Sequence, residues 1–327
     1  MLNDKVVLVT GGTGSFGHRF VETVLDRYKV KRLIIFSRDE LKQYQMRERF
    51  PERAHSELRY FLGDVRDKDR LYRAFDGVNV VIHAAALKQV PACEYNPIEA
   101  IRTNVLGAAN IVDAAIDRNV ERVVALSTDK AANPVNLYGA TKLCSDKLFT
   151  AANSYSGTHA TRFSVVRYGN VMGSRGSVIP LFLKLRESGR LPITDQRMTR
   201  FWITLQQGVD FVLKSLDRMK GGEIFVPKIP SMNVLELARA IGPHCDVEVV
   251  GIRPGEKLHE VMIGEDDART TVEYDDHFAI LPPFHPWSRE EVLRNGGRPC
   301  PDGFRYSSET NGQKLSGDDL QRLIGLA

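Results

Sequence analysis

The chain has few of the residues from which metal sites and disulfides are built. Its four cysteines are scattered over 327 residues and form no C-x-x-C pair. This argues against a zinc site and against a disulfide framework. The eight histidines are equally dispersed, with no H-x-x-x-H pair, so we expect no bound metal.

Long apolar runs and blocks of like charge are also missing. No apolar stretch approaches the ~18–20 residues that a membrane span requires. The start, Met-Leu-Asn-Asp-Lys-Val-Val, lacks the basic segment and long apolar core of a signal peptide. Acidic and basic residues are interleaved, so the net charge of +4 does not indicate a nucleic-acid partner. We expect a cytoplasmic protein with no membrane association.

Short apolar runs alternate with segments of helical spacing. The runs are rich in Val, Ile and aromatic residues and too short for buried helices, which is typical of interior strands of a parallel sheet. They occupy residues 6–10, 33–36, 60–63, 78–83, 123–127 and 164–168. This alternation predicts βαβ units and a doubly wound α/β fold of the Rossmann type.

The pattern changes after Gly169, where Gly and Pro recur up to Pro192. We predict a Rossmann domain of residues 1–172 plus 201–228, in which a helix at 204–219 and a strand at 223–227 return to the main sheet. Residues 173–200 plus 229–327 should form a smaller C-terminal α/β substrate domain, with a helix at 234–241 and a strand at 247–251.

The first expected strand runs directly into a glycine-rich loop. Residues 10–17 read Thr-Gly-Gly-Thr-Gly-Ser-Phe-Gly and contain G-x-G-x-x-G. Such glycines allow close approach of the backbone to a pyrophosphate, and the next helix supplies N–H donors from its N-terminus. The strand before the loop and the helix after it favour a dinucleotide site. Its expected residues are Gly11, Thr13, Gly14, Ser15, Phe16 and Gly17.

The end of the second expected strand bears on the choice of cofactor. NAD sites usually have an acidic residue there, which binds the ribose hydroxyls. Here Ser37 and Arg38, with Lys42 close behind, suit a 2′-phosphate and favour NADP. Asp39 is the competing signal, since a shift of one residue would direct its carboxylate at the ribose, so NAD stays the alternative.

Three later stretches complete the expected cofactor site. Asp64 and Val65 follow the third strand and suit the adenine edge. After the fourth strand, Ala84, Ala85 and Ala86 form a wall of small residues. Lys88, just beyond them, is either a cofactor contact or a solvated lysine of the loop.

Groups able to move protons are concentrated between Thr128 and Lys142. Tyr138 and Lys142 are four residues apart, so in a helix they share one face, and a nearby ammonium lowers the pKa of a phenol. Asp129 and Lys130 follow an apolar run and provide a carboxyl and an amine as acid and base. In isolation the same residues also fit a surface loop and a solvated helix.

Together the glycine loop, Asp64-Val65, the three alanines, Asn104 and Tyr138-x-x-x-Lys142 resemble the extended short-chain dehydrogenase/reductases over nearly the whole chain. The resemblance implies that Tyr138 takes the proton of a sugar hydroxyl and that Thr128 hydrogen-bonds the reacting oxygen. It also implies that Lys142 holds the nicotinamide ribose and lowers the pKa of Tyr138. Asn104 belongs to the expected cofactor residues.

The stretch Thr128-Asp129-Lys130, followed by Ala-Ala-Asn-Pro, narrows the resemblance to the inverting UDP-N-acetylglucosamine 4,6-dehydratases of bacteria. Retaining dehydratases typically have Thr-Asp-Glu, and 4-epimerases need no acid–base pair there. Oxidation at C4 acidifies the C5–H bond. Asp129 would then protonate the departing C6 hydroxyl while Lys130 takes the C5 proton. For this the Lys130 pKa must fall from about 10.4, and we expect Lys142 and the nicotinamide to lower it.

The substrate residues are expected around the same turn and in the second domain. Lys88, Thr128 and Tyr138 should border the reacting sugar, together with Asn170 and Val171. Arg200 and Arg253 are candidates for the diphosphate, because guanidinium groups suit phosphate oxygens. Glu256 suits a ribose hydroxyl of uridine, with an ordinary surface ion pair between Arg253 and Glu256 as the alternative. Lys184 is a weaker candidate.

Two other functions stay open. One is another sugar-nucleotide enzyme, either a 4-epimerase or a dehydratase that also epimerises C3. The other is a catalytically silent dinucleotide sensor, although such proteins often lose the Tyr-x-x-x-Lys pair that this chain retains. The resemblance further implies a homo-oligomer (hexamer or dimer) and a first step toward pseudaminic acid, used on flagellin or surface polysaccharide.

Overall fold

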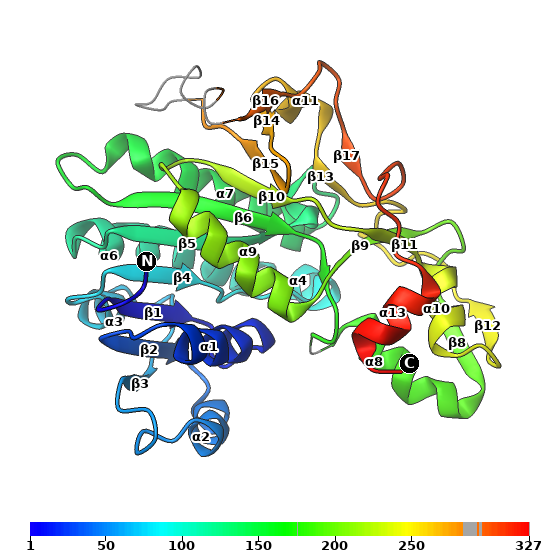
Figure 1. Cartoon of the computed structure of the whole chain (residues 1–327), viewed down its shortest axis with the longest axis horizontal. Coiled ribbons are helices and arrows are strands. Elements are labelled where there is room, and N and C mark those ends of the chain that lie inside the picture. Colours follow the sequence, from blue (N-terminus) through cyan, green and yellow to red (C-terminus); the bar gives the residue numbers. More distant parts are fainter. Residues whose placement is uncertain (175, 284–292, 294–295, 327) are drawn as a thin grey trace.

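The main sheet carries the parallel strands that the apolar runs predict (Figure 1). The computed structural model describes residues 1–174, 176–283, 293 and 296–326. Within them the sheet has ten strands in the order β16-β14-β15-β10-β6-β5-β4-β1-β2-β3. Its parallel part, from β3 to β10, has the doubly wound order. These strands are β1 (Val6–Thr10), β2 (Arg32–Ser37), β3 (Leu58–Leu62), β4 (Val80–His83), β5 (Arg122–Thr128), β6 (Arg162–Tyr168) and β10 (Ile224–Pro227).

Helices cover both faces of this sheet (Figure 1). Helix α1 (Ser15–Arg27) packs against α9 (Leu205–Arg218), whereas α6 (Gly107–Asp117) packs against α3 (Lys68–Ala74) and α7 (Leu137–Tyr155). A capping box fixes the start of α9: the Thr204 hydroxyl accepts from Gln207 N, and the Gln207 side chain accepts from Thr204 N. The shorter helices of this part are α2 (Glu40–Arg49), α4 (Val90–Tyr95), α5 (Pro97–Ile101) and the π-turn η1 (Arg102–Leu106).

A second, smaller core lies beside the sheet, at the right of Figure 1. Ile179, Phe182, Trp202 and Leu237 are buried in it. The expected helices at 204–219 and 234–241 and the strand at 223–227 are present as α9, α10 and β10. The elements around the second core are β7 (Asn170–Val171), α8 (Val178–Leu185), η3 (Arg186–Ser188), β8 (Arg190–Ile193), β9 (Thr199–Ile203), β11 (Ser231–Asn233), α10 (Val234–Ile241), β12 (Asp246–Val249) and α13 (Gly317–Ile324).

The C-terminal part departs from the predicted division. Three of its strands, β14 (Thr271–Glu273), β15 (His277–Ile280) and β16 (Arg298–Pro299), extend the main sheet instead of joining the second core. Strand β15 pairs antiparallel with β10 and buries Phe278 and Ile280 in the main core. Nearby lie α11 (Glu265–Ala268) and the pair β13 (Val261–Ile263) and β17 (Tyr306–Ser307). Residues 284–292 and 294–295 of the expected substrate domain lie outside the described residues.

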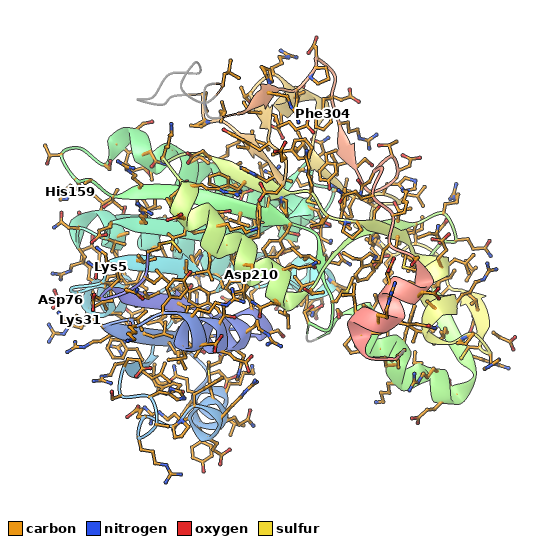
Figure 2. All side chains as sticks on the ribbon, viewed as in Figure 1. Lys5, Lys31, Asp76, His159, Asp210 and Phe304 are labelled. Atoms are coloured by element: carbon orange, nitrogen blue, oxygen red, sulfur yellow. The ribbon has the colours of Figure 1, made fainter. Side chains whose placement is uncertain are left out.

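The parallel strands all begin at one edge of the molecule. Figure 2 labels Lys5, Lys31, Asp76 and His159 at this edge, and these residues precede β1, β2, β4 and β6. The carboxyl ends of the strands therefore meet at the opposite edge, next to the second core. In folds of this type ligands bind at that edge. Among the described residues no helix is both long and apolar enough to cross a membrane.

Candidate active site

The glycine loop connects β1 to α1 at the ligand edge, with Gly14 as the N-cap of α1. A Cβ at Gly17 would collide with the Gly12 carbonyl, and a Cβ at Gly11 would lie 2.8 Å from the Ala85 amide. The two glycines thus let the loop pack tightly against its own backbone and against the segment after β4, which is the compact turn that fits a dinucleotide pyrophosphate. Phe16 packs its ring against Phe20, which anchors the first turn of the helix in the core.

Among the residues after β2, Ser37 and Asp39 are engaged in contacts within the protein, whereas Arg38 is exposed. Ser37 is buried, and its hydroxyl lies 2.8 Å from that of Thr13 in the glycine loop. Asp39 is the N-cap of α2, where it accepts from the Lys42 amide at 2.9 Å and pairs with the Lys42 ammonium at 2.7 Å. The Arg38 side chain is 55% exposed and lies 3.6 Å from Asp64. Capping engages the Asp39 carboxylate, whereas Arg38 presents its cation at the surface.

The wall after β4 is held by Thr10. Its hydroxyl accepts from the amides of Ala84 and Ala85 at 3.2 Å, and therefore donates to His83 Nδ1 at 2.8 Å. Burial, aided by Lys142, lowers the pKa of His83 to about 3. His83 is accordingly a neutral support of the wall. Ala84 and Ala85 are half-buried, and Ala86 and Lys88 are exposed.

Asn104 lies in the π-turn η1 and is buried. Its side chain donates to the Leu87 carbonyl and the Thr141 hydroxyl, and accepts from the Leu87 amide. Asn104 thus ties the loop after β4 to helix α7. Val65 is buried nearby, whereas the Asp64 carboxylate is bound by Arg66 at 2.7 Å.

The catalytic candidates meet where β5 ends. Thr128 caps the short turn η2 (Asp129–Ala131), and its hydroxyl donates to Asp129 Oδ1 at 3.0 Å. Asn136 then caps α7 by accepting from the Gly139 amide at 2.8 Å. This cap starts the helix so that Tyr138 is hydrogen-bonded to Thr128. Thr128, Asp129, Lys130 and Tyr138 are therefore one contiguous group.

Lys130 lies between two buried carboxylates. Its Nζ is 3.0 Å from Asp129 Oδ1 and 3.2 Å from Glu260 Oε1. Burial and the charge of Glu260 raise the pKa of Asp129 above its usual range, against the pull of Lys130. Burial would also raise the pKa of Glu260, but Lys130, Arg200 and Lys257 outweigh it and lower that pKa. Asp129 is thus the carboxyl of this pair that holds a proton more readily.

The expected lowering of the pKa values of Lys130 and Tyr138 is wrong for the protein without cofactor or substrate. Burial would lower the pKa of Lys130, but Asp129 and Glu260 outweigh burial and raise it. The pKa of Tyr138 rises to about 12, because burial outweighs the cation that acts on it, which is Lys130 rather than Lys142. Lys142 is itself buried, which lowers its pKa, and the cation is balanced by Asp146 one turn along α7.

The predicted substrate residues are only partly brought together. Asn170 and Val171 form β7 and are half-buried beside β9. Arg200 is buried, and its guanidinium donates to the carbonyls of Thr199, Lys257 and Leu258. Arg200 therefore binds the backbone of segment 257–260, instead of the substrate diphosphate that the sequence predicts for it. Lys184 is exposed on α8, beside the second core.

Segment 253–260 is tied to the catalytic turn. The Asn136 side chain donates to the Gly255 carbonyl at 2.7 Å, and Lys257 Nζ donates to the Ala132 carbonyl at 2.6 Å. Arg253 is exposed and Glu256 half-buried. The described contacts do not include a side-chain ion pair between Arg253 and Glu256, and only the Arg253 amide faces the Glu256 carboxylate, at 3.5 Å.

Sequence reasoning missed Glu260 and Lys257. Neither stands in a motif of metal-ligand or nucleophile spacing, and both are about 130 residues from Lys130 in the chain. The available signal was a Glu immediately before a short apolar strand, in the stretch Glu-Lys-Leu-His-Glu-Val-Met-Ile. Such a pattern is too common to predict a site.

Comparisons with known proteins agree with this geometry. Residues 7–282 match the family model described as "Polysaccharide biosynthesis protein". The chain is 54% identical to a Campylobacter jejuni protein named UDP-N-acetylglucosamine 4,6-dehydratase (inverting), covering 99% of this chain and 98% of that protein.

Two solved structures have the same architecture. Pen from Bacillus thuringiensis has a TM-score of 0.89 and 35% identity, covering all of this chain and 98% of that one. DesIV from Streptomyces venezuelae, a dTDP-glucose 4,6-dehydratase with NAD and TYD bound, has a TM-score of 0.68 and 26% identity, covering 77% and 86%.

The fold and the site define a dinucleotide-dependent enzyme of the extended short-chain dehydrogenase/reductase class. Within that class, the chain belongs to the polysaccharide biosynthesis protein family.

Proposed function

We propose that this protein is a UDP-N-acetylglucosamine 4,6-dehydratase that inverts C5. The single observation that carries the proposal is the contact of Asp129 with Lys130, at 3.0 Å, beside Tyr138 at the carboxyl end of β5. This group adds an acid and a base to the Tyr138–Lys142 pair, which simple redox chemistry does not need. The 54% identity to the Campylobacter jejuni enzyme supports the same activity.

The dinucleotide, when bound, supplies the redox chemistry by accepting a hydride from C4 and returning it to C6. Tyr138 takes the proton of the C4 hydroxyl as the phenolate, the form that Lys130 and the hydrogen bond with Thr128 favour against burial. The resulting ketone acidifies C5–H. Lys130 takes this proton while Asp129 gives its own to the C6 hydroxyl, which leaves as water. A proton then reaches C5 on the opposite face, so C5 is inverted.

The short contact between Asp129 and Lys130 prepares both groups. A carboxylate beside an ammonium can neither give nor take the required protons. Moving one proton along the 3.0 Å hydrogen bond from Lys130 to Asp129 gives a carboxylic acid and a neutral amine. Burial raises the pKa of Asp129 and so works toward this transfer, whereas Asp129 and Glu260 raise the pKa of Lys130 and work against it.

The proposal includes NADP as the cofactor. Arg38 presents an exposed cation after β2, whereas Asp39 is engaged as a helix cap. Gly11, Thr13, Gly14, Ser15 and Gly17 would hold the pyrophosphate, and Lys142 the nicotinamide ribose. For the substrate we propose Asn170 and Val171 at the sugar, and Arg253 and Glu256 at the uridine diphosphate. The resemblance also supports a cytoplasmic homo-oligomer acting at the start of pseudaminic acid synthesis.

The test is incubation of the protein with UDP-N-acetylglucosamine in deuterium oxide, followed by NMR of the product. A 4-keto-6-deoxy sugar with inverted C5 and deuterium at C5 is expected. A galacto product would indicate a 4-epimerase, and a talo product a dehydratase that also acts on C3. Product without deuterium at C5 would sink the proposed elimination, and unchanged substrate would favour the sensor.

A further inference from the structure

Glu260 contributes a carboxylate to the reaction site from outside the nucleotide-binding part of the sheet. It directly precedes β13, and its side chain is only 2% exposed. Its Oε1 lies 3.2 Å from Lys130 Nζ, almost as close as Asp129 Oδ1. A buried carboxylate at this distance acts on the position and charge of the amine, even though it is remote in sequence.

The backbone of Glu260 is rigidly mounted. Its amide donates to the Ser308 hydroxyl at 2.9 Å, and its carbonyl accepts from the Ser308 amide at 2.8 Å. Ser308 is itself buried and bonded to Thr199 of β9. Arg200 holds the carbonyls of the two residues before His259. Such a mount fixes the carboxylate to one location, as a site residue requires.

Charged groups surround Glu260 from several elements. Lys130 faces it from η2, Arg200 from β9 at 3.8 Å, and Lys257 from its own segment at 4.0 Å. Asp129 and Tyr138 face Lys130 from the other side. Oε2 of Glu260 and Oδ2 of Asp129 are both buried and accept no hydrogen bond from the described residues. Lys130 is therefore the cation that both carboxylates share, while Arg200 and Lys257 also neutralise Glu260 from a greater distance.

We propose that Glu260 is a positioning residue of the elimination site, whose buried carboxylate holds the Lys130 amine beside Asp129 and keeps one negative charge there throughout the reaction. It touches neither the sugar nor the dinucleotide in this role. The inference rests on the proposed roles of Asp129 and Lys130. If the inference is correct, the charge of Glu260 raises the pKa of both Lys130 and Asp129, so Lys130 is a stronger base and Asp129 retains its proton more readily.

The decisive measurement is the titration of Lys130 itself. Acetic anhydride reacts with neutral amines, and mass spectrometry can follow acetylation of Lys130, which is 23% exposed, as a function of pH. Removing a neighbouring negative charge lowers the pKa of an ammonium. In Glu260→Gln the labelling midpoint of Lys130 should fall by about one pH unit or more. This measurement needs no turnover, so it decides the inference whatever product the wild type forms.

Glu309 provides a matched control. Glu309 lies 3.6 Å from His259, and its side chain is 50% exposed. Glu309→Gln removes the same charge and should leave the Lys130 midpoint unchanged. Glu260→Asp covers the case in which the glutamine variant does not fold. It keeps the charge, withdraws it by one methylene, and should lower the midpoint by a smaller amount.

Activity gives a second readout that a merely structural role would not move. In Glu260→Gln the whole pH profile of dehydration should shift to lower pH, because Asp129 and Lys130 both lose a neighbouring anion. A structural defect alone would lower the rate by the same factor at every pH. An unchanged Lys130 midpoint in folded Glu260→Gln would overturn the inference. A wild type that forms no 4-keto-6-deoxy product would instead overturn the proposed function, while the labelling result would still stand.

Discussion

Gly139 of helix α7 packs directly against the carbonyl oxygen of Lys130. A Cβ at this position would lie closer than 3.0 Å to that oxygen, and the Lys130 backbone cannot move away without displacing the turn η2. The absence of a side chain at one residue therefore sets how closely Tyr138 approaches Thr128, Asp129 and Lys130. The start of α7 and the turn η2 are therefore in backbone contact.

Gly139→Ala should consequently separate the helix from the turn. We expect a loss of about 1–3 kcal/mol in the free energy of unfolding, as for overpacked cores, together with a fall in kcat. Urea denaturation and product formation measure the two effects. Gly208→Ala in α9 is the matched control, since a Cβ there meets nothing within 4 Å. It should be neutral or stabilise by about 0.4–1 kcal/mol, and equal losses in both variants would refute the packing argument.

Lys130→Ala should abolish dehydration while the dinucleotide still binds. Loss of a general base costs about 10²–10⁴ in rate, and the glycine loop is separate from η2. The measurements are product NMR and the quenching of protein fluorescence by NADP. Lys31→Ala, at the edge where the strands begin, should behave as wild type (Figure 2). A Lys130→Ala variant that still released water from the substrate would exclude the amine as the base.

Arg38→Ala should weaken NADP binding without weakening NAD binding. The exposed guanidinium is proposed to pair with the 2′-phosphate, which NAD lacks, and loss of such a charge-assisted contact costs about 1.5–3 kcal/mol. Titration calorimetry with each dinucleotide measures both affinities. Arg32→Ala, at the other end of β2, is the control. If Arg38→Ala weakened both dinucleotides equally, the 2′-phosphate assignment would fail.

Stability should fall on acidification partly through His83. Its pKa is about 3 in the folded protein and about 6.5 in an unfolded chain. Between these values the unfolded chain binds a proton that the folded protein excludes, so stability present above pH 6.5 is lost as the pH falls toward 3. The slope from this group approaches about 1.4 kcal/mol per pH unit.

His83→Asn should reduce this dependence, as measured by urea denaturation between pH 4 and pH 8. His159→Gln should retain it, because His159 lies on the surface (Figure 2) and its ring bonds Asn119. If the free energy of unfolding changed equally with pH in wild type and His83→Asn, other groups would be responsible for the loss of stability in acid.

The parts predicted correctly from sequence have local signals. Each parallel strand is a short apolar run because both of its faces are buried, and the glycine loop is readable because its backbone needs specific residues in order. The C-terminal strands β14 and β15 lack such a signal. They are three and four residues long, and the partner that pairs with β15, strand β10, is distant in the chain.

The electrostatics could not be predicted from neighbours in the chain alone. The four-residue spacing predicts Lys142 as the cation that governs the Tyr138 phenol. In the folded protein burial dominates, and Lys130 is the cation that acts on Tyr138. The sequence likewise predicts Arg200 as a phosphate ligand, but its guanidinium donates to the carbonyls of Lys257 and Leu258.

The sequence by itself determined the doubly wound, dinucleotide-binding fold and the glycine loop, and it singled out Thr128, Asp129, Lys130 and Tyr138 as the candidate reacting groups. These features depend on short-range spacing and on the burial of contiguous runs. Only the tertiary structure decided the charge state of the elimination pair, because it brings Glu260 to 3.2 Å from Lys130 across about 130 residues. Coulomb interactions depend on distance in space and on burial, and neither is written in the order of the residues.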